Sequence, residues 1–402
     1  MSRGDGIADR FDVAVVGSGI VGLGAAYAAV RRGLRVVVVD RTERPVGSTI
    51  RNFGHLCIGA QEGLARGYGE TSRGIWLRLA AEAGFWVRAS GTLVVSREHD
   101  ELALLDEATA VDATSGAAGA GIRLLGPSEV TALAPVRAEI VRGGALVDGD
   151  LQVNPREAGA AIVRHLVELG VEFRFRTAVT GVATGVVYTT RGDIVATDVV
   201  VAVNHDLDQL LPEVAERAGM VRCALDMMRV AVDLPAPLHA PVLTGWSLVR
   251  YRRFAALGTA KPLRERLHTR HPDLAALDLN QMYTQLPDGT LLLGDSHRKA
   301  VQPDPFQSEA AFDAFLTGAQ ELFDIRRVRV LERWQGVYAS AAEEFLIEEP
   351  EPGVLVLAVT TGIGMTTGLG LAETETTRVF GWGSDIASTS ATVGGIAQEE
   401  NA

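Results

Sequence analysis

Apolar and polar positions between Phe11 and Asp40 follow the pattern of a strand, a turn, a helix and a second strand. An apolar β-branched run, Val13 to Val16, leads into a glycine-containing turn and an alanine-rich stretch, and a second run, Val36 to Val39, ends at an acid. Continuous apolar runs of this length are typical of strands that are buried on both faces of a parallel sheet. The pattern therefore predicts a βαβ unit at the start of the chain.

The turn of this unit has the glycine spacing of a dinucleotide-binding site. Gly17 allows the tight turn, Gly19 lets the backbone approach a pyrophosphate, and Gly22 lets the helix pack closely on the strand. The helix N-terminus then points unpaired N–H groups at the phosphates, and Asp40 is placed to accept the adenosine ribose hydroxyls. A βαβ unit without a cofactor is the alternative. The candidate cofactor-binding residues here are Gly17, Ser18, Gly19, Ile20, Val21, Gly22, Asp40 and Arg41.

Beyond Asp40 the hydropathy pattern predicts further helices and strands in a mixed order. We expect helices over 69–89, 99–113, 155–169, 262–270 and 308–323, and strands over 91–95, 171–175, 182–190, 194–203, 228–233, 244–256, 280–285 and 290–293. The last third returns to the opening pattern, with a hydrophobic strand over 354–359, a glycine–threonine turn and a helix through Arg378. The first and last parts of the chain are therefore expected to form one domain, with another inserted between them.

Composition and charge fit an ordinary enzyme. With 402 residues, of which 47% are hydrophobic, the chain can bury a large core and is long enough for two domains. The net charge of −12 disfavours nucleic-acid and anionic-membrane partners. No run reaches the length of about 20 apolar residues that a membrane span needs, and the two cysteines, Cys57 and Cys223, lack metal-type spacing. We expect a cytoplasmic protein without a bound metal.

The second glycine turn, TTGIGMTTGLG, favours a flavin. Gly362 and Gly364 allow the backbone to pass against a flat ring, and the following helix offers its positive end to the flavin edge that becomes negative on reduction. A nicotinamide-dependent dehydrogenase would share the first unit but would not need this turn. A glycine-rich strand-to-helix turn of any α/β domain is the plain alternative. The candidate residues are Gly362, Ile363, Gly364, Met365 and Thr366.

Several strings together resemble one enzyme family. These are GSGIVG with Asp40, SxxRNFG (residues 48–54), LVDGDLQVNP, RWQGVYA (residues 333–339) and TGIGMTTGLG. They resemble the D-amino-acid oxidase, glycine oxidase and sarcosine oxidase family of FAD-dependent oxidoreductases over nearly the whole chain. The resemblance implies an α/β fold of mixed α+β character. It consists of a Rossmann-like FAD-binding domain (1–80, 145–222 and 335–380), a substrate domain on a larger mixed or antiparallel sheet (81–144 and 223–334), and a disordered tail (381–402).

The resemblance also implies roles for further residues around the flavin. Ser48, Arg51 and Asn52 are placed beside the isoalloxazine and pyrophosphate, although Arg51 and Asn52 could instead only brace their loop. Some relatives attach the flavin covalently through a histidine or a cysteine, which makes His55 and Cys57 candidates for attachment. The further cofactor-binding candidates are Gly54, Val179 and Gly336.

Substrate binding is where the chain departs from the better-known relatives. D-amino-acid and glycine oxidases carry an arginine for the substrate carboxylate in the stretch that here reads Gly336 to Ala339, where no cation occurs. Shorter strings, VRCALDMMR, LLLGDSH and WQGVY, resemble a clade associated with aminoalkylphosphonate breakdown. We therefore expect an anionic amine bound by basic residues of the inserted domain. The candidates for substrate binding are Arg250, Tyr251, Arg252 and Arg298, although arginines in such strings are more often solvated.

The resemblance implies transfer of a hydride from the carbon beside an amine to flavin N5, followed by hydrolysis of the imine. His297, whose unperturbed pKa lies near neutrality, is the candidate proton acceptor, and Tyr338 is the second candidate catalytic residue. Oxygen or another acceptor would reoxidise the flavin, and an oligomer is possible. The alternatives are an oxidase acting on a carboxylate substrate such as glycine, sarcosine or a D-amino acid, a nicotinamide-dependent dehydrogenase, and a flavin-binding subunit without chemistry of its own.

Overall fold

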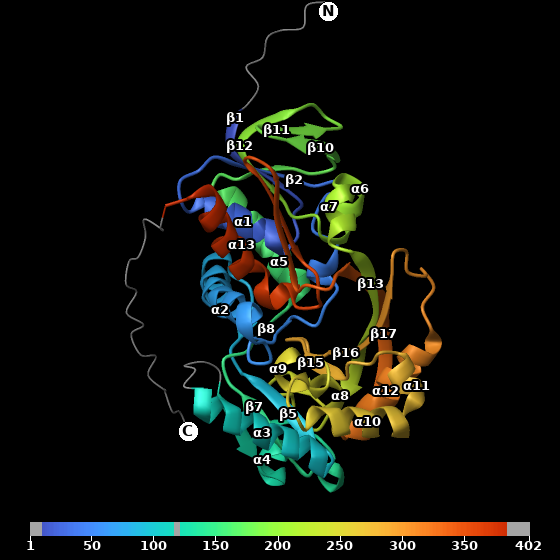
Figure 1. Cartoon of the computed structure of the whole chain (residues 1–402). Helices are drawn as coiled ribbons and strands as arrows, with labels where there is room; N and C mark the ends of the chain where they lie inside the picture. Colours follow the sequence, from blue (N-terminus) through green and yellow to red (C-terminus); the bar gives the residue numbers. More distant parts are fainter. Residues whose placement is uncertain (1–9, 116–120, 384–402) are drawn as a thin grey trace, which may run out of the picture.

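The computed structural model describes residues 10–115 and 121–383. Within these ranges the chain forms two eight-stranded sheets, one three-stranded sheet and the helices that cover them. In Figure 1 the first sheet and its helices occupy the upper part of the molecule, and the second sheet and its helices occupy the lower part. None of the helices in the described ranges combines the length and the apolar content that crossing a membrane requires.

The first sheet is built on parallel strands whose valines are buried on both faces. β1 pairs in parallel with β2 and β12, β2 with β9, and β12 with β19, which confirms the predicted βαβ unit. A hairpin, β10–β11, and β18 extend the sheet. Its strands are β1 (Arg10–Val16), β2 (Val36–Val39), β9 (Glu172–Arg174), β10 (Val179–Ala183), β11 (Val186–Thr189), β12 (Ile194–Val201), β18 (Phe345–Glu351) and β19 (Val354–Val359).

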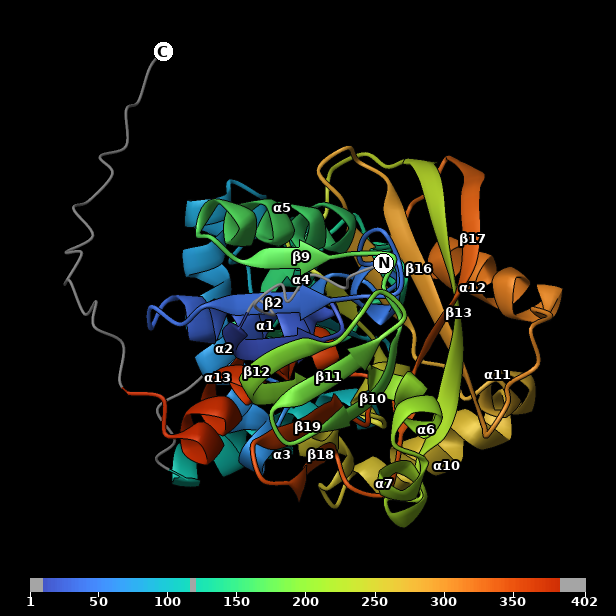
Figure 2. The same ribbon diagram turned by 90° about the horizontal axis from the view of Figure 1, so that it is seen from above.

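Alternate residues of these strands face two different layers. Val13, Val15, Val36 and Val38 pack with four helices, whereas Ala14, Val16, Val37 and Val39 pack with the hairpin and two short helices. Figure 2 looks onto this sheet, with β9, β2 and β12 following one another across the view. The four helices are α1 (Ile20–Val30), α2 (Gly63–Ala83), α5 (Pro155–Glu168) and α13 (Gly364–Phe380), and the short ones are α6 (Leu207–Leu210) and α7 (Pro212–Arg217).

The second sheet has the order β17-β13-β16-β15-β14-β5-β7-β6 and is antiparallel except at the β14–β5 pair. Its long strands carry the chain between the two parts of the molecule, as β13 does in Figure 1. The strands are β5 (Thr92–Ser96), β6 (Ile122–Leu125), β7 (Gly143–Val147), β13 (Val221–Asp233), β14 (Val242–Leu243), β15 (Met282–Gln285), β16 (Leu291–Ala300) and β17 (Arg327–Ser340).

Further helices and a small sheet complete the structure. The helices are α3 (His99–Ser115), α4 (Pro127–Leu133), α8 (Gly245–Leu248), α9 (Arg252–Ala255), α10 (Ala260–Arg270), α11 (Pro272–Ala276) and α12 (Glu309–Leu322). The small sheet consists of β3 (His55–Leu56), β8 (Leu151–Val153) and β4 (Val87–Arg88), and short 3-10 turns lie at η1 (Ser48–Ile50), η2 (Ala138–Ile140) and η3 (Asn204–Asp206).

One predicted strand is wrong. The segment 244–256 forms the short helices α8 and α9. Trp246 and Leu248 are both buried, so an apolar run that is covered on all sides shows no periodicity that separates a strand from a helix. The hydroxyls of Thr244 and Ser247 bond to the carbonyl oxygen of Gln281, which anchors the helical turn beside β15.

The predicted domain boundaries stay predictions. β17 runs unbroken across the boundary predicted after residue 334, and β7 lies in the second sheet. Of the tail predicted to be disordered, Gly381 ends α13 and Trp382 is buried, with its indole N–H donating to Asp198 at 2.9 Å. The rest of that tail, 384–402, lies outside the described residues.

The contact between α13 and α2 depends on Gly370. A Cβ built on this residue would lie 2.0 Å from the carbonyl oxygen of Tyr68, so Gly370→Ala forces the two helices apart. We expect a loss of about 1–3 kcal/mol in the free energy of unfolding, measured by urea denaturation. Gly74→Ala on the exposed face of α2, where a Cβ meets nothing within 4 Å, is the control and should be neutral or slightly stabilising. Equal stability of the two variants would contradict this packing.

Candidate functional site

A cavity of about 730 Å³ lies between the two parts of the molecule, a volume within the usual range of ligand sites. One end is lined by the carboxyl ends of the parallel strands and by the turns that follow them. The other end is lined by residues of the second sheet and of the segment around α8 and α9. In open parallel sheets this edge is where ligands bind.

The first glycine turn can lie at this edge because its three glycines have no side chains. Gly17 has φ +104°, and a Cβ there would lie 2.6 Å from the carbonyl oxygen of Ala202, at the end of β12. A Cβ on Gly22 would lie 2.0 Å from the carbonyl oxygen of Gly17. A Cβ on Gly19, by contrast, would meet only Thr49 Oγ1 at 3.5 Å. Gly17 and Gly22 are therefore required by the fold, whereas Gly19 keeps the cavity open.

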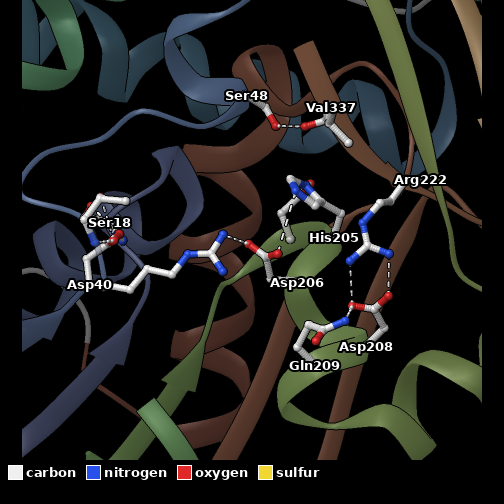
Figure 3. A network of polar contacts seen from close by, with 12 residues as sticks. Ser18, Asp40, Ser48, His205, Asp206, Asp208, Gln209, Arg222 and Val337 are labelled. Carbon is white, nitrogen blue, oxygen red and sulfur yellow. Dashed lines mark hydrogen bonds and ion pairs between the residues drawn. The ribbon is translucent and has the colours of Figure 1, made fainter. Parts of the chain in front are cut away.

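The Asp40 carboxylate is held by the turn that it faces (Figure 3). Its Oδ2 accepts hydrogen bonds from the Ser18 amide at 2.8 Å and the Ser18 hydroxyl at 2.6 Å. Its Oδ1 accepts from the Thr42 amide at 2.9 Å and the Thr42 hydroxyl at 2.8 Å. The Thr42 hydroxyl also lies 2.6 Å from the Arg44 carbonyl oxygen, and its single proton can be donated there instead. Asp40 Oδ1 then has an acceptor site for a ribose hydroxyl at the cavity wall.

Two helices begin at the cavity. Ile20 and Val21 of α1 and Gly364 and Met365 of α13 line it, and neither helix has a side-chain cap from its own N-cap residue. Only the Ile20 amide of α1 has a side-chain partner in the described residues, Thr49 Oγ1 at 2.9 Å. Helix N-termini attract negative charge, so the two suit a pyrophosphate and the electron-rich edge of a flavin.

Thr361 adds a further sign that the cavity receives a polar group. Its hydroxyl is buried at the cavity wall, just before α13, and has no hydrogen-bond partner among the described residues. Buried hydroxyls are normally paired. With the open glycine turn and the two helix N-termini, this unpaired hydroxyl fits a dinucleotide cofactor such as FAD.

The loop after β2 is braced against β17. The Ser48 hydroxyl donates to the Val337 carbonyl at 2.6 Å (Figure 3), and Arg51 donates to the Gln335 carbonyl at 3.2 Å. The Asn52 amide donates to the carbonyls of Ser48 and Thr49. Ser48, Arg51 and Asn52 all line the cavity, so they hold the loop in place and also face the ligand space.

Residues after β12 form a polar wall on the same side. Arg41 pairs with Asp206 at 2.6 Å, and Arg222 donates to Asp208 at 2.8 Å (Figure 3). Burial lowers the pKa of His205 between them, which favours the neutral ring. His205 and Asp206 line the cavity close to where the first glycine turn ends.

The far end of the cavity gathers polar and charged groups. Arg250 donates to the carbonyl oxygen of Asp278 at 2.9 Å and pairs with its carboxylate. His297 contacts the same carbonyl through Nδ1 at 3.0 Å, and burial, with the nearby Arg250 charge, holds its pKa well below the usual range. Burial also raises the pKa of Tyr338 and Tyr251, so both phenols are neutral. Lys299, Asn280 and Asp295 complete this end.

Most residues proposed from the sequence meet at this cavity. Those that line it are Gly17, Gly19, Ile20, Val21, Asp40, Arg41, Ser48, Arg51, Asn52, Val179, Arg250, Tyr251, Arg252, His297, Gly336, Tyr338, Gly362, Ile363, Gly364 and Met365. Ser18, Gly22, Gly54, His55, Thr366 and Arg298 do not.

Residues away from the cavity have structural partners. Gly54 packs against the Val153 carbonyl, where a Cβ would lie 2.0 Å away. Thr366 accepts a hydrogen bond from the Cys57 amide at 3.1 Å. Arg298 pairs with the fully buried carboxylate of Asp226 at 2.8 Å, so its charge is already neutralised within the protein.

His55 is buried in a network of its own. Thr92 donates to Asp150 at 2.6 Å, so its oxygen accepts from His55 Nε2, also at 2.6 Å. The other ring nitrogen lies 3.1 Å from Met282 Sδ. Cys57 lies close by and does not line the cavity. Neither candidate for covalent flavin attachment therefore faces the ligand space.

Some cavity residues were not predicted from the sequence. Thr49, Asn280 and Asp295 were not singled out, although Thr49 bonds to the first amide of α1. A signal existed only for Asp295, which stands two positions before the predicted catalytic residue His297.

The comparisons with known proteins agree with this geometry. A family model described as FAD dependent oxidoreductase matches residues 12–377. Glycine oxidase from Bacillus cereus ATCC 14579 has a similar structure, with a TM-score of 0.74 and 15% identity over 93% of this chain and 96% of that chain. Glycine oxidase from Geobacillus kaustophilus has a TM-score of 0.72 and 19% identity over 92% and 94% of the two chains.

A third similar structure contains the cofactor. Dithionite-reduced L-alpha-glycerophosphate oxidase from Mycoplasma pneumoniae, with FAD bound, has a TM-score of 0.72 and 17% identity over 93% of this chain and 96% of that chain. At these identities the likeness shows the fold. Comparison with curated proteins gives no match.

The openness of the cavity at Gly19 yields a test of FAD binding. Gly19→Val keeps an ordinary backbone conformation, φ −70°, and its side chain extends into the cavity where the phosphates are expected. The variant should purify largely without FAD, which flavin absorbance measures. It should still fold, which an unchanged melting temperature of the apoprotein would show. Gly74→Val on exposed α2 is the control and should keep its FAD. Full flavin content in Gly19→Val would overturn the placement of the pyrophosphate.

Asp40 is expected to contribute less than the glycine turn. Asp40→Ala removes the acceptor for the ribose and leaves the buried Ser18 amide without its partner, so FAD affinity should fall by about 1–3 kcal/mol. Titration of the apoprotein with FAD measures the change. Ser18→Ala, which keeps the carboxylate but loses one of its donors, should weaken FAD binding by a smaller amount. If Asp40→Ala binds FAD as tightly as the parent does, the ribose does not bind at Asp40.

Proposed function

The chain belongs to the FAD dependent oxidoreductase family, and on that premise we propose that it oxidises the carbon–nitrogen bond of a small amine that also carries an acid group. Bound FAD supplies the acceptor for a hydride from the carbon beside the nitrogen. The resulting imine is hydrolysed by water to a carbonyl compound and ammonia, or methylamine from an N-methyl substrate. The protein's part is to orient the amine and to keep its nitrogen unprotonated.

One observation carries this proposal. A single cavity connects the first glycine turn with Arg250 and Lys299, and so joins the expected cofactor site to cations at its far end. The stretch Gly336 to Ala339, which also borders the cavity, contributes no cation. An acid group on the substrate would therefore be bound at the far end, with the rest of the substrate lying toward the flavin.

Arg250 is the best candidate for binding the acid group. Its side chain is mostly buried and is held in place by Asp278, which uses Nη1, so the other guanidinium N–H groups can serve a ligand. Arg252 also lines the cavity, but it is 62% exposed and pairs with Glu62 and Glu344. The guanidinium of Arg298 already forms an ion pair with the buried carboxylate of Asp226. We assign the acid group to Arg250 and Lys299.

We further propose that the acid is a phosphonate, as in an aminoalkylphosphonate. Two separate cations can bind three oxygens and up to two negative charges at once, whereas a carboxylate needs only one bidentate partner. A carboxylate substrate remains the second candidate, because structural neighbours include enzymes named glycine oxidase and L-amino acid deaminase.

Anaerobic reduction of the flavin distinguishes the candidates. The purified protein is mixed without oxygen with 2-aminoethylphosphonate, its N-methyl form, glycine, sarcosine, D-alanine or a neutral alkylamine, and the loss of flavin absorbance is followed. We expect the two phosphonates to reduce the flavin at the lowest concentrations. Faster reduction by glycine or a D-amino acid would favour the carboxylate substrate. Equal reduction by the neutral amine would contradict an anionic substrate altogether.

The role of Arg250 gives a sharper test. Arg250→Met removes the charge but leaves Asp278, which is more than half exposed, in contact with water, so the fold should tolerate the change. The KM for the best amine should rise roughly 10- to 200-fold, the effect of losing a charge-assisted contact, with FAD content unchanged. Arg270→Met, at an exposed ion pair on α10, is the control and should match the parent. Parental kinetics in Arg250→Met would mean that the acid group of the substrate does not bind at this end of the cavity.

A further inference from the structure

We propose that the carboxylate of Asp295 binds the nitrogen of the substrate and accepts a proton from it. This assignment rests on the proposed function, because it takes the substrate to be a small amine. It adds a residue for the nitrogen to those proposed for the acid group, and so defines both ends of the substrate.

The Asp295 side chain is buried at the cavity wall with one oxygen unused. It is 8% exposed and lines the cavity, and Oδ1 has no hydrogen-bond partner among the described residues. The residue falls at an irregularity of β16, where Gly294 pairs with Met227 and Ser296 with Asp226, and such bulges redirect side chains. An unpaired buried carboxylate oxygen is costly, so a donor that enters the cavity is favoured there.

The second oxygen of Asp295 faces His297. The carbonyl oxygen of Asp278 can only accept, so His297 Nδ1, 3.0 Å away, carries the proton that it donates. A neutral ring then has a bare Nε2, which lies 3.4 Å from Asp295 Oδ2. Two acceptors that face each other repel unless a proton lies between them. The pair is therefore built to take up one proton.

The surroundings decide which member of the pair receives it. Burial and the Arg250 charge hold the pKa of His297 well below its usual value, so the ring is a poor site for a second proton. Burial raises the pKa of Asp295 to about 7, against the opposing effects of Arg250 and the Asn280 side chain. At slightly alkaline pH the carboxylate is ionised and close to its point of protonation. The groups that face it are Arg250 and Tyr251, Asp278, Tyr338 of β17, Cys223 of β13, and His297 and Lys299 of β16.

The proton transfer involves only the substrate and Asp295 and needs no further reactant. The substrate enters as an ammonium ion; one N–H bond breaks, its electron pair stays on nitrogen, and an O–H bond forms on Asp295. Both charges vanish, which is favourable at a carboxylate that is only 8% exposed. The nitrogen then holds the lone pair that forms the imine double bond when hydride leaves the neighbouring carbon. Arg250 and Lys299 keep the acid end apart from this centre.

Matched ligands test the assignment on reduced holoenzyme without oxygen, where no turnover follows binding. The pairs are 2-aminoethylphosphonate with ethylphosphonate, and glycine with acetate, with affinities measured by calorimetry. In the parent, the amine of the better-bound pair should bind roughly 10- to 100-fold more tightly than its amine-free partner. Asp295→Asn should remove this difference and change the affinity of the amine-free ligand less than about threefold. Asp313→Asn, at an exposed position of α12, is the control and should keep the difference.

A measurement on the unmodified protein covers the case in which Asp295→Asn does not fold. As pH rises from about 6 to 8, Asp295 ionises, so the ammonium ligand should gain affinity relative to its amine-free partner. A flat ratio over this range overturns the assignment, and so does an Asp295→Asn protein that still prefers the amine. Equal binding of both members of each pair, or no binding of any ligand, overturns it as well.

The two proposals fail in different ways. If amines reduce the flavin of the parent while Asp295→Asn keeps the preference for the amine, the proposed function stands and the assignment of Asp295 fails. If Asp295→Asn loses the preference while no amine in the panel reduces the flavin of the parent, Asp295 binds the nitrogen and the proposed oxidation fails.

Discussion

The close approach of the first glycine turn to the end of β12 is the constraint on which the site depends. At Gly17 a Cβ would lie 2.6 Å from the carbonyl oxygen of Ala202, and at Gly22 it would lie 2.0 Å from the turn itself. Without these side chains, parallel strands β1 and β12 end side by side and α1 begins directly after the turn. The amides of the first turn of α1 then face the cavity, and Asp40 is fixed at its edge. Any larger residue at Gly17 or Gly22 would move all of these groups together.

The two ends of the cavity make different electrostatic demands. At the glycine turns, backbone amides and two helix N-termini favour a ligand with negative charge. At the far end, Arg250, Lys299 and Asp295 lie within one wall of the second part of the molecule. Charged groups in a confined space are costly unless they are paired. A small molecule with an acid group and an amine would pair both signs at once, whereas a neutral amine would offer no negative group to Lys299 or to the guanidinium N–H groups of Arg250 that Asp278 does not use.

The elements that could be predicted from the sequence are those specified by local pattern. Glycine spacing and β-branched runs sufficed for the first βαβ unit, because a positive φ and burial on both faces are properties of a few neighbouring residues. The segment 244–256 could not be assigned in this way, since its first half, residues 244–249, is buried on all sides by distant residues. The same holds for charge: Arg250 and Arg298 look alike in the sequence, and only the fold places Asp226 beside the second. The partner of Asp295 and its unpaired oxygen depend likewise on β16 and its neighbours.

We propose that one cavity holds FAD at the glycine turns and an amine with an acid group between the flavin and the far wall. A crystal structure of the reduced holoenzyme with 2-aminoethylphosphonate, grown and soaked without oxygen, tests this claim most directly. We expect the phosphonate oxygens within hydrogen-bond distance of Arg250 and Lys299, the nitrogen on Asp295 Oδ1, and the carbon beside it facing the flavin. A ligand with its phosphonate at the glycine turns, or bound outside the cavity with Asp295 unchanged, would contradict this claim.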